Sequence, residues 1–251
     1  RLHKLEQASR NRGPSLAAGA SARPDEPEEN HDSVDELLLD DEATLLSLGE
    51  AADDTVAATG EDVDDLFSPI SRLPSYAVSR NAFERLLDYQ RIGVEWLVGL
   101  HERRFGGILG DEMGLGKTIQ VAVLLRMLLS SHKLLGPVLV VCPLTVVSQW
   151  VKELHVWAPQ LRVCVYHSSG TSSNYQALIA SVRNTPAAVI TTYATLTLKC
   201  DELIGANFQY VILDEGHKIA NPETAVTLAA KSFVTPHRLI LTGSPIQNTL
   251  K

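Results

Sequence analysis

The chain has 251 residues, of which 30 are acidic, 22 are Lys or Arg and 3 are Cys. No apolar run reaches the roughly 18–20 residues of a membrane-spanning helix, so we expect no membrane protein. The first residues are not followed by the apolar stretch of a secretion signal. Three cysteines without C-x-x-C spacing argue against a disulfide framework or a zinc knuckle, and favour a reducing compartment.

The negative charge is concentrated at the N-terminus. Residues 1–70 hold 18 acidic and 5 basic groups, whereas residues 71–251 hold 12 acidic and 17 basic groups. Residues 21–65 contain no aromatic residue and would bury too little apolar surface to offset the entropy of ordering. We therefore expect residues 1–80 to form a largely disordered acidic leader. Leucines at helical spacing between Val34 and Leu48 leave a second interpretation open, a short helix that docks on a basic face.

From residue 81 onward, the hydrophobic pattern predicts alternating helices and strands. Asp88 is expected to cap a helix that extends to about residue 103. Further helices are expected at residues 118–131, 145–157 and 175–183, and strands at residues 107–110, 138–141, 161–166, 188–193, 210–213 and 238–242. Continuous apolar strands that alternate with helices are typical of a mainly parallel sheet covered on both faces. The sequence therefore predicts one α/β domain over residues 81–251.

A phosphate-binding loop is predicted between the first of these strands and the helix that follows it. In residues 114–118, Gly-Leu-Gly-Lys-Thr, glycines let backbone N–H groups turn toward phosphate oxygens beside the positive end of a helix. Lys117 would reach the β- and γ-phosphates of ATP, and the Thr118 hydroxyl would bind Mg²⁺. The strict pattern G-x-x-x-x-G-K-[ST] is not met, because Asp111 stands where Gly is expected. On these residues alone, a glycine turn with a surface lysine remains an alternative.

Two carboxylates follow the strand expected at residues 210–213. Asp214 and Glu215 end a buried apolar run, and ligands of α/β proteins collect at the carboxyl ends of the strands. Asp214 would hold Mg²⁺ through water, and Glu215 would orient and deprotonate the attacking water. The alternative is a helix cap with acidic residues in its first turn. It is less favoured once the phosphate-binding loop is considered together with the carboxylate pair.

Six segments, in order, resemble the motifs of the Snf2 family of superfamily 2 ATPases. Residues 111–120 resemble motif I, and Asp at position 111 is the family's own form of it. Residues 87–97 resemble the adenine-contacting segment. Motif Ia, motif Ib, the DExH box and motif III are resembled by residues 141–150, 190–193, 214–217 and 241–248. The resemblance implies a single RecA-like P-loop NTPase lobe with ATP and Mg²⁺ as its ligands.

The resemblance assigns roles around the nucleotide. Gln90 would read the adenine base, and His217 would couple the nucleotide to motif III through Thr242, Ser244 and Gln247. The ATP-binding loop would consist of Asp111, Glu112, Met113, Gly114, Leu115, Gly116, Lys117 and Thr118.

Motifs Ia and Ib would contact the phosphates of DNA. The candidates for these contacts are Pro143, Thr145, Gln149, Thr192 and Tyr193. Trp150 and Trp157 recur on one helix face and are expected in the core rather than stacked on bases.

Within the family, residues 214–222 and 235–238 look most like the Cockayne-syndrome group B type. That likeness implies an ATP-driven translocase on double-stranded DNA, located in the nucleus, that acts on stalled RNA polymerase II in transcription-coupled repair. The alternatives are a nucleosome or chromatin remodeller of another Snf2 subfamily, an RNA helicase, and a truncated fragment that binds without hydrolysis. Such ATPases receive their arginine fingers from a second RecA-like lobe, so we expect this chain alone to bind ATP·Mg²⁺ weakly and hardly hydrolyse it.

Overall fold

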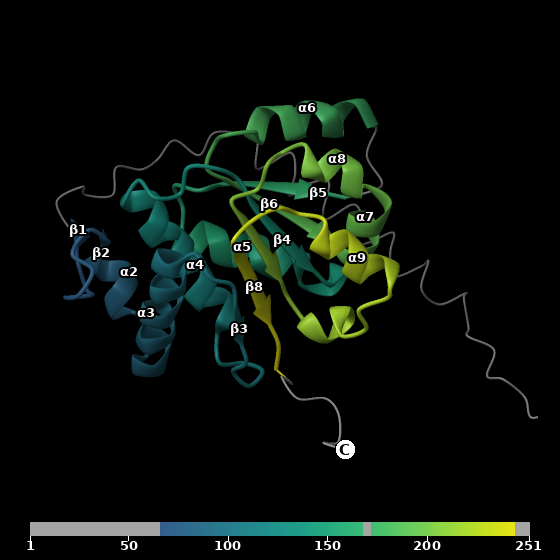
Figure 1. Ribbon diagram of the computed structural model, residues 1–251. Coiled ribbons are helices and arrows are strands. Elements are labelled where there is room, and N and C mark those ends of the chain that lie inside the picture. Colours follow the sequence, from purple (N-terminus) through teal and green to yellow (C-terminus); the bar gives the residue numbers. More distant parts are fainter. Residues whose placement is uncertain (1–65, 168–171, 244–251) are drawn as a thin grey trace, which may run out of the picture.

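In the computed structural model, which describes residues 66–167 and 172–243, the described residues form a six-stranded sheet covered by helices (Figure 1). All neighbouring strands are parallel. Their order is β3 (Gly107–Leu109), β8 (His237–Leu241), β7 (Tyr210–Leu213), β4 (Val138–Cys142), β6 (Ala187–Thr192) and β5 (Arg162–Tyr166). This confirms the predicted α/β class, and every predicted strand lies within one residue of its observed ends.

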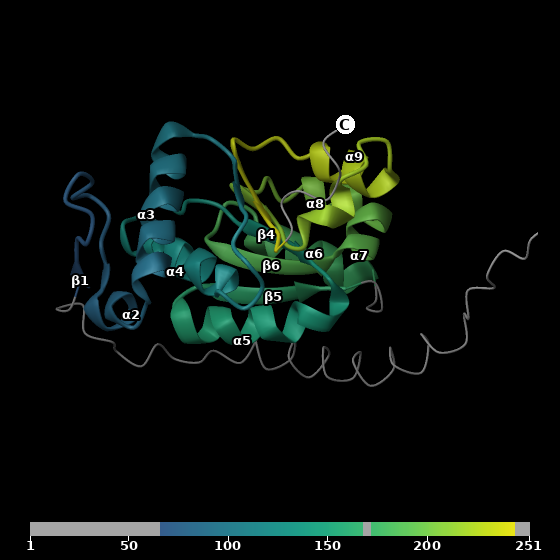
Figure 2. The ribbon, with the colours of Figure 1, turned by 90° about the horizontal axis from the view of Figure 1, so that it is seen from below.

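The strands are apolar on both faces because each face packs against a helical layer. Successive side chains of a strand point to opposite faces. Val138 and Val140 of β4 accordingly pack in one core, while Leu139 and Val141 pack in the other. The first core is closed by α3 (Asp88–Arg103), α4 (Lys117–Ser130) and α5 (Val147–Trp157). The second is closed by α6 (Ser172–Val182), α7 (Tyr193–Leu198), α8 (Cys200–Ile204) and α9 (Ala225–Lys231). Figure 2 shows α5 on one side of the sheet and α8 and α9 on the other.

Helix α3 begins differently from the expectation. Leu87, not Asp88, is the N-cap, because the Gln90 side chain accepts the Leu87 backbone N–H at 3.0 Å. Asp88 is the first residue of the helix, where its carboxylate pairs with Arg91. The helix expected from residue 145 starts as a 3-10 turn, η3 (Leu144–Val146), before α5.

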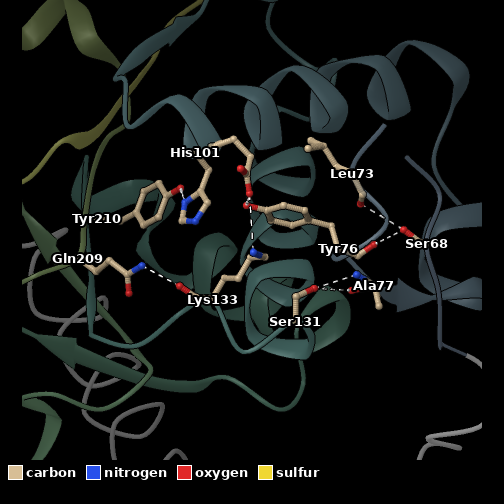
Figure 3. Close-up of polar contacts among 10 residues, drawn as sticks. Ser68, Leu73, Tyr76, Ala77, His101, Ser131, Lys133, Gln209 and Tyr210 are labelled. Atoms are coloured by element: carbon tan, nitrogen blue, oxygen red, sulfur yellow. Dashed lines mark hydrogen bonds and ion pairs between the residues drawn. The ribbon is translucent and has the colours of Figure 1, made fainter. Parts of the chain in front are cut away.

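The folded domain begins earlier than residue 81. β1 (Leu66–Phe67) pairs with β2 (Val78–Ser79) in an antiparallel ribbon that leads into α2 (Arg80–Glu84). Tyr76 is fully buried, and its hydroxyl donates to Glu102 of α3 (Figure 3). Residues 66–80 therefore belong to the domain, and the expected leader boundary at residue 80 is wrong. The remaining leader, including the segment from Val34 to Leu48, lies outside the described residues.

A polar pocket of about 690 Å³ lies at the amino-terminal edge of the sheet. His101 stacks on His237 with ring centroids 4.6 Å apart, and its Nδ1 lies 2.6 Å from the Tyr210 hydroxyl, as Figure 3 shows for His101 and Tyr210. Burial lowers the pKa of His101 to about 4 and also lowers the pKa of His237. No residue of the predicted phosphate-binding loop lines this pocket.

Two further features concern the surface. Strand β3 lies at one edge of the sheet, and its Ile108 is 57% exposed. Among the described residues, no helix has the length and apolarity needed to span a bilayer.

Candidate nucleotide-binding site

The phosphate-binding loop and the carboxylate pair lie at the same edge of the sheet. The loop follows β3 and the pair follows β7, with the parallel strand β8 between them. Backbone hydrogen bonds hold the start of each segment. The Thr242 N–H donates to the carbonyl of Leu109, the last residue before the loop, at 3.2 Å, and the Asp214 N–H donates to the Val141 carbonyl at 2.8 Å. Burial raises the pKa of the Asp214 carboxyl group, and the Lys117 ammonium is near enough to be among the groups that oppose this rise. Two segments far apart in sequence therefore converge at one site.

Two glycines shape the loop. Gly114 and Gly116 have φ values of 85° and 74°, a left-handed conformation that side chains rarely adopt. Gly116 is also the N-cap of α4 and supplies no side-chain acceptor, so the first N–H groups of that helix are left for another ligand. Lys117 Nζ donates to the carbonyls of Asp111 and Glu112 at 2.7 and 2.9 Å. Free N–H groups and an ammonium inside one loop suit a polyphosphate.

Gln120 explains how Asp111 fits into the loop. Its Nε2 donates to Asp111 Oδ2 at 2.8 Å, so the carboxylate that replaces glycine is held from the next turn of α4. Gln120 is fully buried and lies against Gly93 of α3, where a Cβ atom would come within 1.9 Å of Gln120 Oε1. The sequence placed Gln120 at the end of motif I without a role, although an amide within the run Ile119 to Leu125 was a visible signal.

Gln90 contacts the loop rather than facing outward. Its Oε1 accepts the Leu87 N–H, and its Nε2 donates to the Leu115 carbonyl at 3.2 Å. A Cβ atom on Gly116 would lie 2.5 Å from Gln90 Nε2, so the glycine is needed for this contact as well. Each bond uses only half of the amide's capacity, because Nε2 keeps a second N–H and Oε1 a second lone pair. Reading of an adenine base by Gln90 stays a prediction.

Asp214 is held from three directions. The indole N–H of Trp150 donates to Oδ2 at 2.8 Å, and the backbone N–H of Glu215 donates to Oδ1 at 2.9 Å. The Tyr193 hydroxyl donates to the Asp214 backbone carbonyl. Burial raises the pKa of Asp214, and the two N–H donors oppose that rise because they stabilise the carboxylate. Protein groups alone therefore hold this carboxylate in place.

Glu215 and His217 form a second pair. Glu215 has a left-handed backbone, with φ 53° and ψ 56°, which a residue with a side chain adopts only under local constraint. It is followed by the 3-10 helix η4 (Gly216–Ile219), and this turn brings His217 Nδ1 to 3.2 Å from Glu215 Oε2. Of the partners expected for His217, Thr242 is buried beside the loop, while Ser244 and Gln247 lie outside the described residues.

The five candidates for DNA contact divide into two groups. Thr145 and Gln149 are exposed, and Pro143 is half-buried, all at or beyond the carboxyl end of β4. Thr192 is buried and caps α7 by accepting the Thr195 N–H at 3.2 Å. Tyr193 is also buried, with its hydroxyl used by Asp214, so the structure does not present these two side chains to a phosphate.

Trp150 and Trp157 are both core residues, as predicted. The contact between Trp150 and Asp214 was not foreseen, because nothing in the local pattern relates residues 64 positions apart.

The donor set suits magnesium bound together with phosphate. Within residues 66–167 and 172–243, no group of three or more His, Cys, Asp or Glu side chains could hold a metal ion by itself. Mg²⁺ typically needs only one or two carboxylates when substrate phosphates and water complete its shell. Asp214 and Thr118 are the residues that would supply the protein's share.

Residues 89–251 match the sequence model of a protein family, the SNF2-related domain. Human DNA excision repair protein ERCC-6 is 45% identical over 202 residues, which cover 76% of this chain and 13% of that protein. DNA repair and recombination protein RAD26 of Saccharomyces cerevisiae is 36% identical over 227 residues, covering 72% of this chain and 21% of that protein. Among solved structures, the Sulfolobus solfataricus SWI2/SNF2 ATPase core in complex with dsDNA matches with a TM-score of 0.57 and 33% identity, over 66% of this chain and 33% of that one. The chain thus spans a small part of the curated relatives that it matches.

Proposed function

Because the chain belongs to the SNF2-related family of ATPases, we propose that it binds ATP with Mg²⁺ and forms the first RecA-like lobe of a DNA-dependent ATPase. The observation that carries this proposal is the convergence of Lys117 with Asp214 and Glu215 at one edge of the sheet. The solved relative at 33% identity is itself a SWI2/SNF2 ATPase core, which supports the RecA-like assignment.

Each residue of the site has a chemical role in this proposal. The α4 N-terminus and Lys117 would neutralise the β- and γ-phosphates, and Thr118 and Asp214 would hold Mg²⁺. Lys117 would exchange the carbonyls of Asp111 and Glu112 for phosphate oxygens, since it donates to both in this structure. Glu215 would accept the proton of the attacking water, and His217 beside it would hold its carboxylate in place. Bound MgATP supplies the phosphoanhydride bond whose hydrolysis drives movement.

We further propose that the substrate is double-stranded DNA and the activity is translocation. Three observations support this: the relative solved with dsDNA, the exposed Thr145 and Gln149, and the excess of 17 basic over 12 acidic groups in residues 71–251. The likeness to ERCC-6 and RAD26 favours a nuclear role in transcription-coupled repair, on stalled RNA polymerase II. Chromatin remodelling by another Snf2 subfamily is the competing role.

Nucleotide binding tests the first proposal. We expect a fluorescent ADP analogue with Mg²⁺ to bind this chain, and we expect Lys117→Ala to abolish that binding. Binding that is unchanged in that variant would overturn the site. In a protein that also carries the second lobe, hydrolysis should rise with naked duplex DNA. Stimulation by nucleosomes well above that by naked DNA would instead favour the remodeller, and stimulation by RNA alone would favour an RNA helicase.

A further inference from the structure

Two side chains reach Asp214 from opposite helical layers. Trp150 belongs to α5 and to the core on one face of the sheet, while Tyr193 opens α7 and belongs to the core on the other face. The Trp150 indole donates to the Asp214 carboxylate, and the Tyr193 hydroxyl donates to the Asp214 carbonyl. Both layers of the domain thus meet at the residue that would hold the metal.

The Trp150 contact differs from an ordinary core hydrogen bond. Trp157, on the same helix, donates its indole N–H to Glu153, one turn away at 3.0 Å. Four residues before and after Trp150 stand Val146 and Leu154, which offer no side-chain acceptor, and its N–H is satisfied across the sheet edge by Asp214. With only 1% of Trp150 exposed, packing leaves the indole little freedom to turn away.

The bond leaves Asp214 free to bind a metal. Oδ2 accepts one N–H from Trp150 and Oδ1 accepts one from Glu215, and each carboxylate oxygen keeps a further lone pair. Such outer hydrogen bonds orient a metal-binding carboxylate, and their loss typically costs about 10–100-fold in metal affinity.

We propose that Trp150 is a positioning residue that aims the Asp214 carboxylate at Mg²⁺ and ties the metal site to helix α5. This inference rests on the proposed nucleotide site. The same helix exposes Gln149, and the turn before it exposes Thr145. A duplex lying on that surface would contact α5, the helix whose Trp150 holds Asp214. The same helix would then contact DNA and position the metal-binding carboxylate.

Magnesium titration tests the positioning role. We would measure binding of the fluorescent ADP analogue to this chain at increasing Mg²⁺, for wild type, Trp150→Phe and Trp157→Phe. Trp150→Phe should require about 10-fold or more Mg²⁺ for half-maximal binding, because the ring remains but the N–H is lost. Trp157→Phe is the matched control: it removes an indole N–H from the same helix without touching Asp214, and should titrate like wild type.

A second measurement does not depend on how well Trp150→Phe folds. The chain has 3 Trp residues, so three indole N–H signals are expected in a ¹⁵N NMR spectrum. Trp96→Phe and Trp157→Phe each remove one signal, and the signal that remains in both variants belongs to Trp150. Asp214→Asn should shift the Trp150 signal and leave the Trp157 signal in place. Mg²⁺ added with ADP should likewise move Trp150 selectively.

The outcomes separate the two proposals. If wild type binds no MgADP, the nucleotide site fails and the positioning role fails with it. If wild type binds but Trp150→Phe and Trp157→Phe titrate alike, or Asp214→Asn leaves the Trp150 signal unmoved, only the positioning role is overturned.

Discussion

The stacked histidines at the amino-terminal edge predict that the domain loses stability as the pH falls from 7 to 5. His101 has a pKa of about 4 in the folded chain, against about 6.5 when unfolded, mainly because the folded ring is buried. At a pH between these two pKa values, His101 is protonated in the unfolded chain and neutral in the folded chain. The free energy of unfolding therefore decreases as the pH decreases. At pH 5 the linkage relation gives a loss of about 2 kcal/mol from His101 alone, relative to pH 7.

Urea unfolding followed by circular dichroism at pH 7 and pH 5 would measure this loss. In His101→Gln the difference between the two pH values should shrink by about 2 kcal/mol, because the titrating group is gone. His155→Gln, a change on the exposed side of α5, is the control and should keep the wild-type difference. An equal pH dependence in wild type and His101→Gln would refute the reasoning.

Three further predictions concern the nucleotide site. Gly93→Ala should destabilise the domain by about 1–3 kcal/mol in thermal or urea unfolding, since the new Cβ meets Gln120 Oε1 at 1.9 Å; an unchanged stability would mean that Gln120 moves aside freely. In a protein with both lobes, Lys117→Ala should raise the barrier to hydrolysis by about 3–4 kcal/mol, measured as slower phosphate release, because a charge beside the phosphates is lost. Near-normal turnover would show that Lys117 does not contact the phosphates. Glu215→Gln in that protein should retain ATP without cleaving it, seen as bound nucleotide on a filter, and normal release of phosphate would show that another group accepts the proton.

The sequence was sufficient for features that are encoded locally. The strand at 138–142 is a continuous run of apolar residues, and such runs predict buried parallel strands from a short window. The phosphate loop and the pair Asp214–Glu215 were predictable for the same reason, since each follows a strand directly and strand ends share an edge of the sheet.

The rest depends on contacts between distant residues. Trp150 reads as an apolar helix residue in any window, and only the folded chain brings its N–H to Asp214. Tyr193 was expected among the contacts to DNA, but motif position does not show which way a ring points, and the ring lies in the core. Helices α7, α8 and α9 were missed because segments of five to seven residues span too few turns to show helical periodicity. Residues 66–80 were assigned to the leader because the antiparallel ribbon contains only two residues per strand.

The position of β3 has a consequence for how the chain behaves among other chains. One side of this strand pairs with β8, and among the described residues no strand pairs with its other side, so exposed Ile108 lies on the kind of sheet edge where a further strand can add. An extended peptide that pairs there would lie directly below the loop that carries Lys117, because that loop leaves from the end of the same strand. Strand addition at this border would therefore bring a second chain next to the candidate nucleotide site.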